Sequence, residues 1–224
     1  PIKSIPEAVC CPSSAKAMPL SSKLGGLPAR AYIEYVFGDN ILKKTLGIAT
    51  LNALSAACWE RMPNKGYSLM MNIDAFDAAK IRPGEKAVVV GALVPVIRQL
   101  LQKEIDFKIL ELDPATLKPQ ELEHYAPAAD AHLYVPDADL LVITGTTLIN
   151  DTLPGLLELA KPGARIIVTG PTASMLPDAF FSRGVTALGS ILVTRPDELL
   201  DVISQAGSGY HFFGKSADRM LICK

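Results

Sequence analysis

The sequence has no excess of basic residues, and this limits the partners that the protein can have. Its 22 lysines and arginines are balanced by 23 aspartates and glutamates, which leaves a formal net charge of −1. Nucleic acids and anionic membrane surfaces attract proteins through a positive field. We therefore expect neither nucleic acid nor a membrane surface as the main partner.

Long apolar runs are also missing. No stretch approaches the roughly 20 apolar residues that a membrane-spanning helix needs, and no basic segment followed by an apolar stretch marks a signal peptide. The chain begins at Pro1 rather than at a methionine. We expect that part of the protein precedes this residue.

The residues that bind soft metals are few and scattered. The four cysteines lack C-x-x-C or zinc spacing, and the three histidines match no metal motif. This pattern predicts free thiols in a reduced cytoplasm and no metal site made by the protein's own side chains. The residues are Cys10, Cys11, Cys58, Cys223, His124, His132 and His211.

Motifs of known catalytic chemistry are absent as well. The sequence contains no G-x-S-x-G elbow, no phosphate-binding G-x-x-x-x-G-K-[ST] loop and no complete G-x-G-x-x-G. No nucleophile is paired with a recognisable base. Whether the protein is an enzyme therefore stays open, and the sequence assigns no cofactor.

What the sequence does contain is a regular alternation of strands and helices from Ile81 onward. Short apolar strands are expected at 86–90, 107–110, 140–144, 165–169 and 185–193, the last one bent or interrupted at Gly189. Amphipathic helices are expected near 93–101, 153–160 and 196–205. Strands buried on both faces that alternate with helices indicate an α/β fold with a mostly parallel, Rossmann-like sheet.

The first part of the chain lacks this alternation of strands and helices, and we place a domain boundary near residue 78. Residues 1–77 would form a small N-terminal domain and residues 78–224 the Rossmann-like domain. Within the first, 8–11 is a candidate strand, and a helix over 41–60 would be capped by Asp39. The final segment, 210–223, could add an edge hairpin.

Two similar loops follow successive strands of the predicted sheet. One reads Thr144-Gly145-Thr146-Thr147, with Asn150 shortly after it, and the other reads Thr169-Gly170-Pro171-Thr172. Hydroxyls and free amides at a helix start bind anions, and glycine lets a ligand approach the backbone. We expect both loops to line one pocket for a small polar or anionic ligand. The alternative is that they only end strands and cap helices.

Gly91 and Glu111 resemble two elements of a dinucleotide site. Gly91 ends the first strand of the sheet, and Glu111 lies 20 positions later at the end of the second, where a ribose-binding acid would stand. The second and third glycines of the fingerprint are missing, which argues against ordinary NAD binding. Glu111 is expected to accept a hydrogen bond from a ribose or diol, or else to be a solvated strand end.

The first part of the chain could complete this pocket. Asn52 lies on the same side of its helix as Ile48, and it would either tie the helix to a loop or contact the ligand. Lys16, within the loop 13–22, is a second candidate. Because pockets often form at domain junctions, we expect a ligand site in an interdomain cleft.

Several segments together resemble a prokaryotic heavy-metal chelation family whose members are uncharacterised. They are residues 46–54, 88–91, 144–150 and 168–172. The resemblance implies a small α+β domain like the N-terminal domain of enolase, here truncated at its N-terminus, followed by a Rossmann-like domain. It also implies a metal chelate as the ligand.

Three functional hypotheses follow. The protein could bind a small molecule or metal chelate, or be an enzyme acting on a nucleotide-, pterin- or S-adenosyl-like molecule. It could also be a non-catalytic interaction module, and a homo-oligomer is compatible with all three. Fold does not decide among them, but the threonine-rich loops favour a small ligand.

Overall fold

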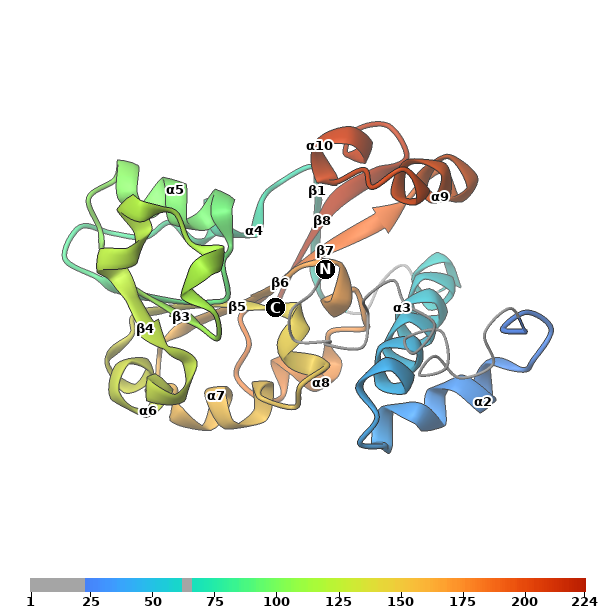
Figure 1. Ribbon diagram of the computed structural model, residues 1–224, viewed down its shortest axis with the longest axis horizontal. Coiled ribbons are helices and arrows are strands. Elements are labelled where there is room, and N and C mark those ends of the chain that lie inside the picture. Colours follow the sequence, from blue (N-terminus) through green and yellow to red (C-terminus); the bar gives the residue numbers. More distant parts are fainter. Residues whose placement is uncertain (1–22, 62–65) are drawn as a thin grey trace.

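The computed structural model describes residues 23–61 and 66–224, and these form one mixed sheet flanked by helices (Figure 1). The predicted strand at 8–11, Lys16 and the loop 13–22 lie outside the described residues. Within them the sheet has eight strands in the order β1-β8-β7-β6-β5-β2-β3-β4. The strands are β1 (Ser68–Met71), β2 (Lys86–Val90), β3 (Asp106–Glu111), β4 (Tyr125–Pro127), β5 (Leu140–Thr144), β6 (Arg165–Thr169), β7 (Ala187–Val193) and β8 (Ala217–Cys223).

Six of these strands are parallel, and their order reverses once. From β2 the chain moves outward to β3 and β4, then returns to place β5 on the other side of β2 and continues to β6 and β7. The predicted Rossmann-like, mostly parallel sheet is confirmed. In such sheets the crevice for a ligand opens at the carboxyl ends of the two strands that flank the reversal, here β2 and β5.

Helices cover both faces of the parallel part (Figure 1). The short helix α4 and the longer α5 lie above the sheet in this view, and α6, α7 and α8 lie below it. The helices are α2 (Ala29–Ile33), α3 (Ile41–Arg61), α4 (Ala75–Ala79), α5 (Val94–Gln102), α6 (Ala131–Tyr134), α7 (Leu153–Leu159), α8 (Asp178–Phe181), α9 (Pro196–Ser204) and α10 (Gly209–Phe212).

Each face of the sheet has its own apolar core, because successive side chains of a strand point to opposite faces. In β5, Leu140 and Val142 join the core that contains Phe76 from α4 and Ile97 from α5. The alternate residues of β5 join a second core, together with side chains of α7 and α8. The continuous apolar strands predicted from the sequence are thus explained by burial on both sides.

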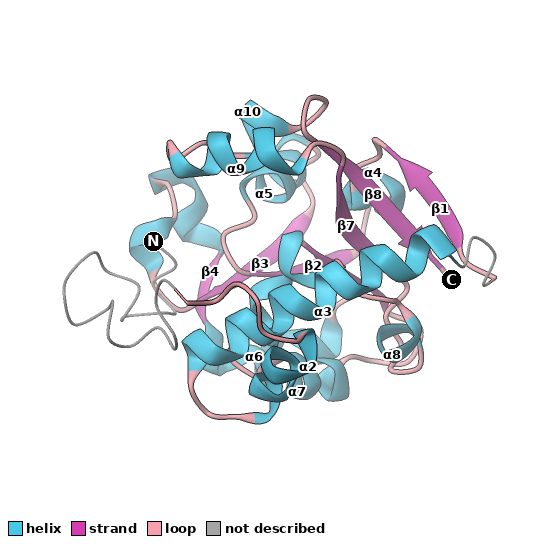
Figure 2. Ribbon diagram, turned by 90° about the vertical axis from the view of Figure 1, so that its right-hand side faces the viewer, coloured by secondary structure: helices cyan, strands magenta, loops and turns pink. Residues whose placement is uncertain are grey.

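Helix α3 does not lie on a sheet face but crosses the loops at the carboxyl end of the sheet (Figure 2). Its buried Ile48 packs with Ile149 from the loop after β5. The sequence placed the helix correctly, but the cap is different from the predicted Asp39. Asn40 Oδ1 accepts a hydrogen bond from the Lys43 amide at 2.9 Å, as an N-cap residue does.

Two expectations for the far side of the sheet are wrong. Residues 210–223 form no edge hairpin, since α10 comes first and β8 then lies between β7 and β1 in antiparallel register. Strand β7 also continues through Gly189. A Cβ at that position would lie 2.3 Å from Thr169 Oγ1 and 2.8 Å from Ala75 Cβ, so the glycine is explained by close packing rather than by a break.

β1 joins the sheet although it precedes the predicted boundary at residue 78. It pairs with β8, with Ser68 opposite Cys223. The division into two domains at that residue stays a prediction.

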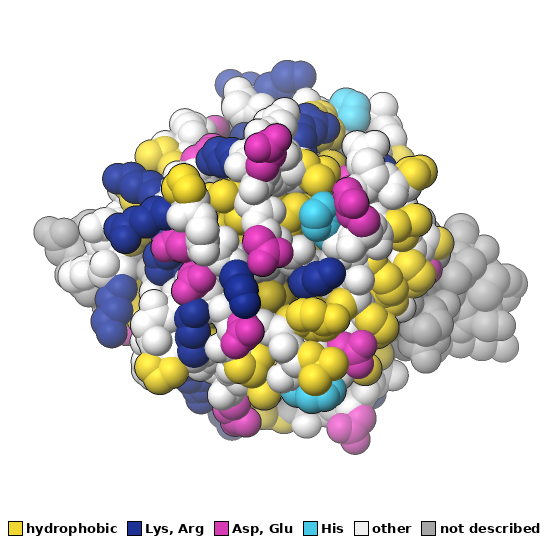
Figure 3. All heavy atoms as spheres, turned by 90° about the vertical axis from the view of Figure 1, so that its left-hand side faces the viewer, with side chains coloured by type: hydrophobic (Ala, Val, Ile, Leu, Met, Phe, Trp, Pro, Cys, Tyr) yellow, Lys and Arg dark blue, Asp and Glu magenta, His cyan; other side chains and the backbone are white. Residues whose placement is uncertain are grey.

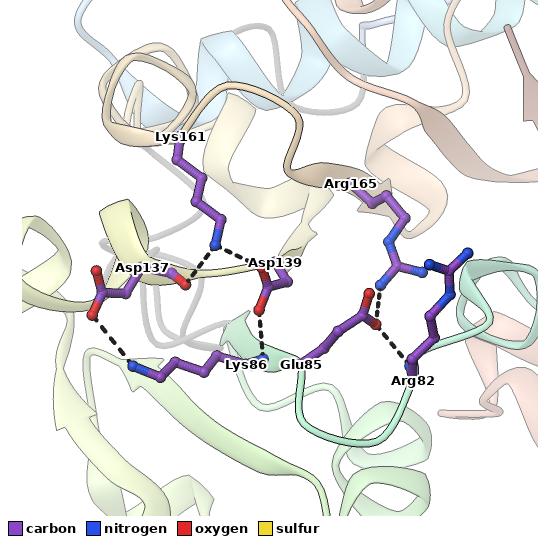
Figure 4. A network of polar contacts seen from close by, with 7 residues as sticks. All are labelled: Arg82, Glu85, Lys86, Asp137, Asp139, Lys161 and Arg165. Carbon is purple, nitrogen blue, oxygen red and sulfur yellow. Dashed lines mark hydrogen bonds and ion pairs between the residues drawn. The ribbon is translucent and has the colours of Figure 1, made fainter.

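The amino ends of the central strands are tied by a network of charged groups (Figure 4). Asp139 precedes β5 and accepts hydrogen bonds from Lys161 Nζ at 2.6 Å and from the Lys86 amide at 2.9 Å. Arg165, the first residue of β6, pairs with Glu85 and donates to the carbonyl oxygens of Ala79 and Lys80. These contacts join three strands at one end of the sheet.

Elsewhere the surface carries charges of both signs. On the face at the left of Figure 1, lysine and arginine side chains alternate with aspartates and glutamates (Figure 3). This agrees with the balanced composition. Among the described residues, no helix is long and apolar enough to cross a membrane.

Candidate functional site

A pocket of about 1020 Å³ opens at the reversal of strand order, between the carboxyl ends of β2, β3 and β5. Its volume is at the upper end of the range for small-molecule sites, about 300–1000 Å³. One part of its wall is aliphatic and the other carries hydroxyl, amide and carboxylate groups. The lining residues are Val90, Gly91, Ala92, Leu93, Leu110, Glu111, Leu112, Asp113, Thr116, Ala128, Thr144, Thr146, Thr147, Asn150, Thr152 and Leu156.

Gly91 sets the width of the crevice. Its φ of +94° lies in the region that favours glycine, and a Cβ there would lie 2.8 Å from Thr144 Cγ2. The turn after β2 can therefore lie directly against the end of β5. The structure brings these two predicted site residues together in the lining of the pocket.

Glu111 lies at the pocket with its carboxylate held by the backbone. Oε2 accepts from the Ala92 amide at 2.8 Å, and Oε1 accepts from the amides of Leu112 and Asp113 at 2.7 and 3.3 Å. Glu111 thus connects the end of β3 to the turn after β2. Each carboxylate oxygen can accept more than one hydrogen bond, so a contact with a ligand hydroxyl stays a prediction.

The first threonine loop forms the opposite wall. It is the short 3-10 helix η6 (Gly145–Leu148). Thr144 Oγ1 lies 3.1 Å from Thr146 Oγ1, while Thr147 Oγ1 donates to the Thr144 carbonyl oxygen at 2.7 Å. Thr147 therefore holds the loop, and Thr144 and Thr146 line the pocket with their hydroxyls in contact with each other. Asn150 Oδ1 accepts from Thr152 Oγ1 at 2.7 Å and orders the next turn.

The second threonine loop, with the 3-10 helix η7 (Pro171–Ala173), packs against the first. A Cβ on Gly145 would lie 3.0 Å from the Ala173 amide nitrogen and 3.2 Å from Thr172 Cβ. The strand ends are also in register, Thr144 opposite Thr169. However, the lining of this pocket contains Thr144, Thr146 and Thr147 but not Gly145, Thr169, Gly170, Pro171 or Thr172.

Helix α3 holds both loops through one face. Asn52 Nδ2 donates to the carbonyl oxygens of Pro171 and Thr172, each at 3.1 Å, so Asn52 ties the helix to a loop. Lys44, whose side chain is only 7% exposed, pairs with Asp151 beside Asn150. Among the described residues, the lining itself comes only from residues 90–156. The interdomain cleft stays a prediction.

Sequence reasoning missed some of these residues. Asp113, Thr116 and Ala128 come from the irregular segment between β3 and β5, which has no periodicity to interpret. Lys44 did have a signal, since it lies four residues before Ile48 and eight before Asn52. A lysine on the buried face of a helix needs an acidic partner.

The donor groups in this part of the chain do not fit a soft metal ion. The described residues contain no group of three or more His, Cys, Asp or Glu side chains placed to hold a metal. Of the described cysteines, Cys58 and Cys223 are free, and burial raises the pKa of the Cys223 thiol. The pocket offers oxygen donors, and both its carboxylates already accept backbone hydrogen bonds.

Comparison with known proteins gives consistent matches. The model of the DUF364 family, described as "Putative heavy-metal chelation", matches residues 74–222, and that of DUF4213, with the same description, matches residues 5–55. An uncharacterised protein of Methanocaldococcus jannaschii is 32% identical over 188 residues, which cover 83% of this chain and 68% of that protein.

Two crystal structures of DUF364 proteins of unknown function share the fold. The protein from Pyrococcus horikoshii superposes with a TM-score of 0.73 at 23% identity, over 98% of this chain and 81% of that one. The protein from Desulfitobacterium hafniense superposes with a TM-score of 0.72 at 25% identity, over 92% of this chain and 78% of that one.

Proposed function

Since this chain belongs to the DUF364 family, which is described as "Putative heavy-metal chelation", we propose that it binds a small organic ligand, free or as a metal chelate, in the pocket between β2, β3 and β5. The observation that carries the proposal is the coincidence of this pocket with the reversal of strand order. That is the position where open α/β sheets bind their ligands.

The chemistry of the wall supports an organic ligand rather than a bare ion. Leu93, Leu110 and Leu156 offer apolar surface, whereas Thr146 and Asn150 offer groups that orient a polar molecule. A few polar groups in a mostly apolar pocket are typical of small-molecule sites. A metal would then be held by the chelator, with the protein contacting the chelator.

In this proposal helix α3 fixes the shape of the site. The Lys44–Asp151 pair lies next to Asn150, and Asn52 fixes the loop packed behind Gly145. Whether the second threonine loop adds direct contacts is part of the proposal and is tested with it, while a contact from Lys16 stays a prediction.

The test is a thermal-shift screen of the full chain, followed by calorimetry. The panel contains nucleosides and nickel chelates of histidine and of citrate, with each metal salt alone as a reference. A ligand present at 100 times its Kd stabilises the folded state by about 2.7 kcal/mol, enough to raise the Tm measurably. Metal analysis of protein purified in chelator-free buffer should show no stoichiometric zinc or iron.

Variants then locate the site. Thr146→Val keeps the shape of the side chain and removes one hydroxyl, so the Kd should rise about 3- to 10-fold. Thr194→Val, on an exposed residue after β7 and outside the lining, should leave the Kd unchanged. A loss of affinity in Thr172→Val would extend the site to the second loop. Equal Kd values for wild type and Thr146→Val would refute the proposed site.

A further inference from the structure

The turn between β2 and α5 differs from a dinucleotide-binding turn in what its amides do. In a Rossmann crevice the free amides at the start of the first helix bind the pyrophosphate. Here that turn comprises Gly91 to Leu93 and leads directly into α5 at Val94. It lies in the wall of the pocket, so its hydrogen-bonding capacity decides which ligands fit.

Every amide of this turn already has an acceptor. The Gly91 amide donates to the Leu110 carbonyl oxygen at 2.9 Å, and the Ala92 amide donates to Glu111 Oε2 at 2.8 Å. The amides of Leu93 and Val94 donate to the carbonyl oxygens of Gly91 and Ala92, at 2.8 and 3.0 Å. Pro95 follows and has no N–H. The amides of Gly91 to Val94 are therefore not free to bind a phosphate.

The charge of the pocket wall also disfavours a phosphate. Glu111 occupies the Ala92 amide with a carboxylate, where a phosphate oxygen would otherwise be held. A second carboxylate, Asp113, also lines the pocket, and the described residues contribute no lysine, arginine or histidine to the lining. Like charges brought together in a partly desolvated site repel strongly, so an anionic group near Glu111 is disfavoured.

The rest of the crevice still suits the neutral part of a nucleotide. Glu111 stands at the end of β3, the position from which an acid contacts a ribose hydroxyl. Leu112 and Ala128 provide apolar surface nearby, and the hydroxyls of Thr144 and Thr146 lie across the crevice. None of these contacts requires a phosphate group on the ligand.

We infer that the pocket binds a nucleoside or nucleoside-like molecule without phosphate groups and rejects the corresponding nucleotides. This inference rests on the proposed function and adds the class of ligand. It differs from the expectation of an anionic ligand, because the side of the crevice that would hold an anion is closed by Glu111 and by the turn itself.

The experiment compares adenosine and other common nucleosides with their monophosphates and with NAD, by calorimetry on the full chain. We expect at least one nucleoside to bind and its monophosphate to bind at least about tenfold more weakly, a difference of about 1.4 kcal/mol. The difference should shrink when the salt concentration rises from about 0.05 to about 0.5 M, because salt screens the repulsion.

A variant links the selectivity to Glu111. In Glu111→Gln the charge is removed. The ratio of the monophosphate Kd to the nucleoside Kd should then fall from at least about 10 toward 1. Glu158→Gln, on an exposed residue of α7, is the control and should leave the ratio unchanged. The salt series needs no variant, so the test does not depend on whether Glu111→Gln folds.

The outcomes that contradict the inference can be told apart from those that contradict the proposed function. A monophosphate or NAD that binds as tightly as the nucleoside would overturn the inference. If no nucleoside binds, the inference is also wrong, but the proposed function stands when a chelate gives a thermal shift that Thr146→Val reduces. If no compound of either kind binds, both are refuted.

Discussion

The two ends of the parallel sheet are stabilised by different kinds of contact. At the amino ends, charged side chains such as Asp139 and Arg165 bridge neighbouring strands (Figure 4). At the carboxyl ends, backbone turns, glycines and the Glu111 carboxylate surround the pocket, and polar side chains of α3 hold the loops from outside. A sheet tied by side chains at one end can leave the other end open for a ligand. The two ends should therefore respond differently to substitution and to pH.

The largest effect is expected from Gly91→Ala, at the pocket end. The added Cβ would meet Thr144 Cγ2 at 2.8 Å and would force a left-handed conformation on alanine. Backbone strain and overpacking together should lower the free energy of unfolding by about 2–4 kcal/mol. Urea denaturation measures this loss.

The matched control is Gly155→Ala, inside α7. Nothing lies within 4 Å of a Cβ at that position, so the change should stabilise the protein by about 0.5–1 kcal/mol. If both alanine variants change stability equally, the special role assigned to Gly91 is wrong.

A smaller loss is expected from Arg165→Met, at the amino end. The methionine keeps part of the packing but leaves two carbonyl oxygens without their side-chain donor and Glu85 without its charged partner. The free energy of unfolding should fall by about 2 kcal/mol, while ligand affinity of the folded protein stays the same. Arg195→Met, which breaks the exposed Arg195–Glu198 pair, should change stability by less than about 0.5 kcal/mol. An effect of Arg165→Met on ligand affinity would contradict the separation of the two ends.

The smallest effect is expected in how the stability of the fold depends on acidic pH. Hydrogen bonds from Lys161 and the Lys86 amide hold the pKa of Asp139 below its ordinary value of 3.8. The Arg82 amide, together with Arg165, holds the pKa of Glu85 below 4.5. Groups whose pKa is lowered by folding stabilise the protein above their ordinary pKa, and this stability is lost as the pH falls through the folded value.

Asp139→Asn should therefore lower stability at neutral pH and flatten its decline in acid. Unfolding by urea from about pH 7 down to about pH 3 tests this. Asp201→Asn, on an exposed residue of α9, serves as the reference. If wild type and Asp139→Asn lose stability in parallel below about pH 4, the carboxylate has no such role.

Much of the fold could be predicted because the central strands carry strong local signals. The bounds predicted for β2, β5 and β6 agree with the structure, since each has a buried apolar run between turn residues. β1 and β4 were missed. Each has three or four residues, β1 is largely exposed, and Pro127 ends β4, so neither has a periodicity that a sequence can show.

For the candidate site, the sequence located the strand ends but not the contacts between them. Gly91, Glu111 and the first threonine loop lie at the pocket because parallel strands end at the same edge of the sheet. The backbone hydrogen bonds of Glu111 and the buried Lys44 depend on residues far away in the chain. Local patterns carry no information about such partners.

The antiparallel pairing of β1 with β8 also has a consequence for how the chain folds as it is made. Ser68 is opposite Cys223, and Met71 is opposite Met220, so this contact joins residues that are synthesised at very different times. Non-local strand pairing is slow, and domains begin to fold from the N-terminal side during translation. β1 therefore has no strand partner until β8 has been synthesised. Its side chains Leu69 and Met71 remain more than 40% exposed even in the finished sheet. Until β8 is made, β1 has none of the hydrogen bonds that hold it in the finished sheet.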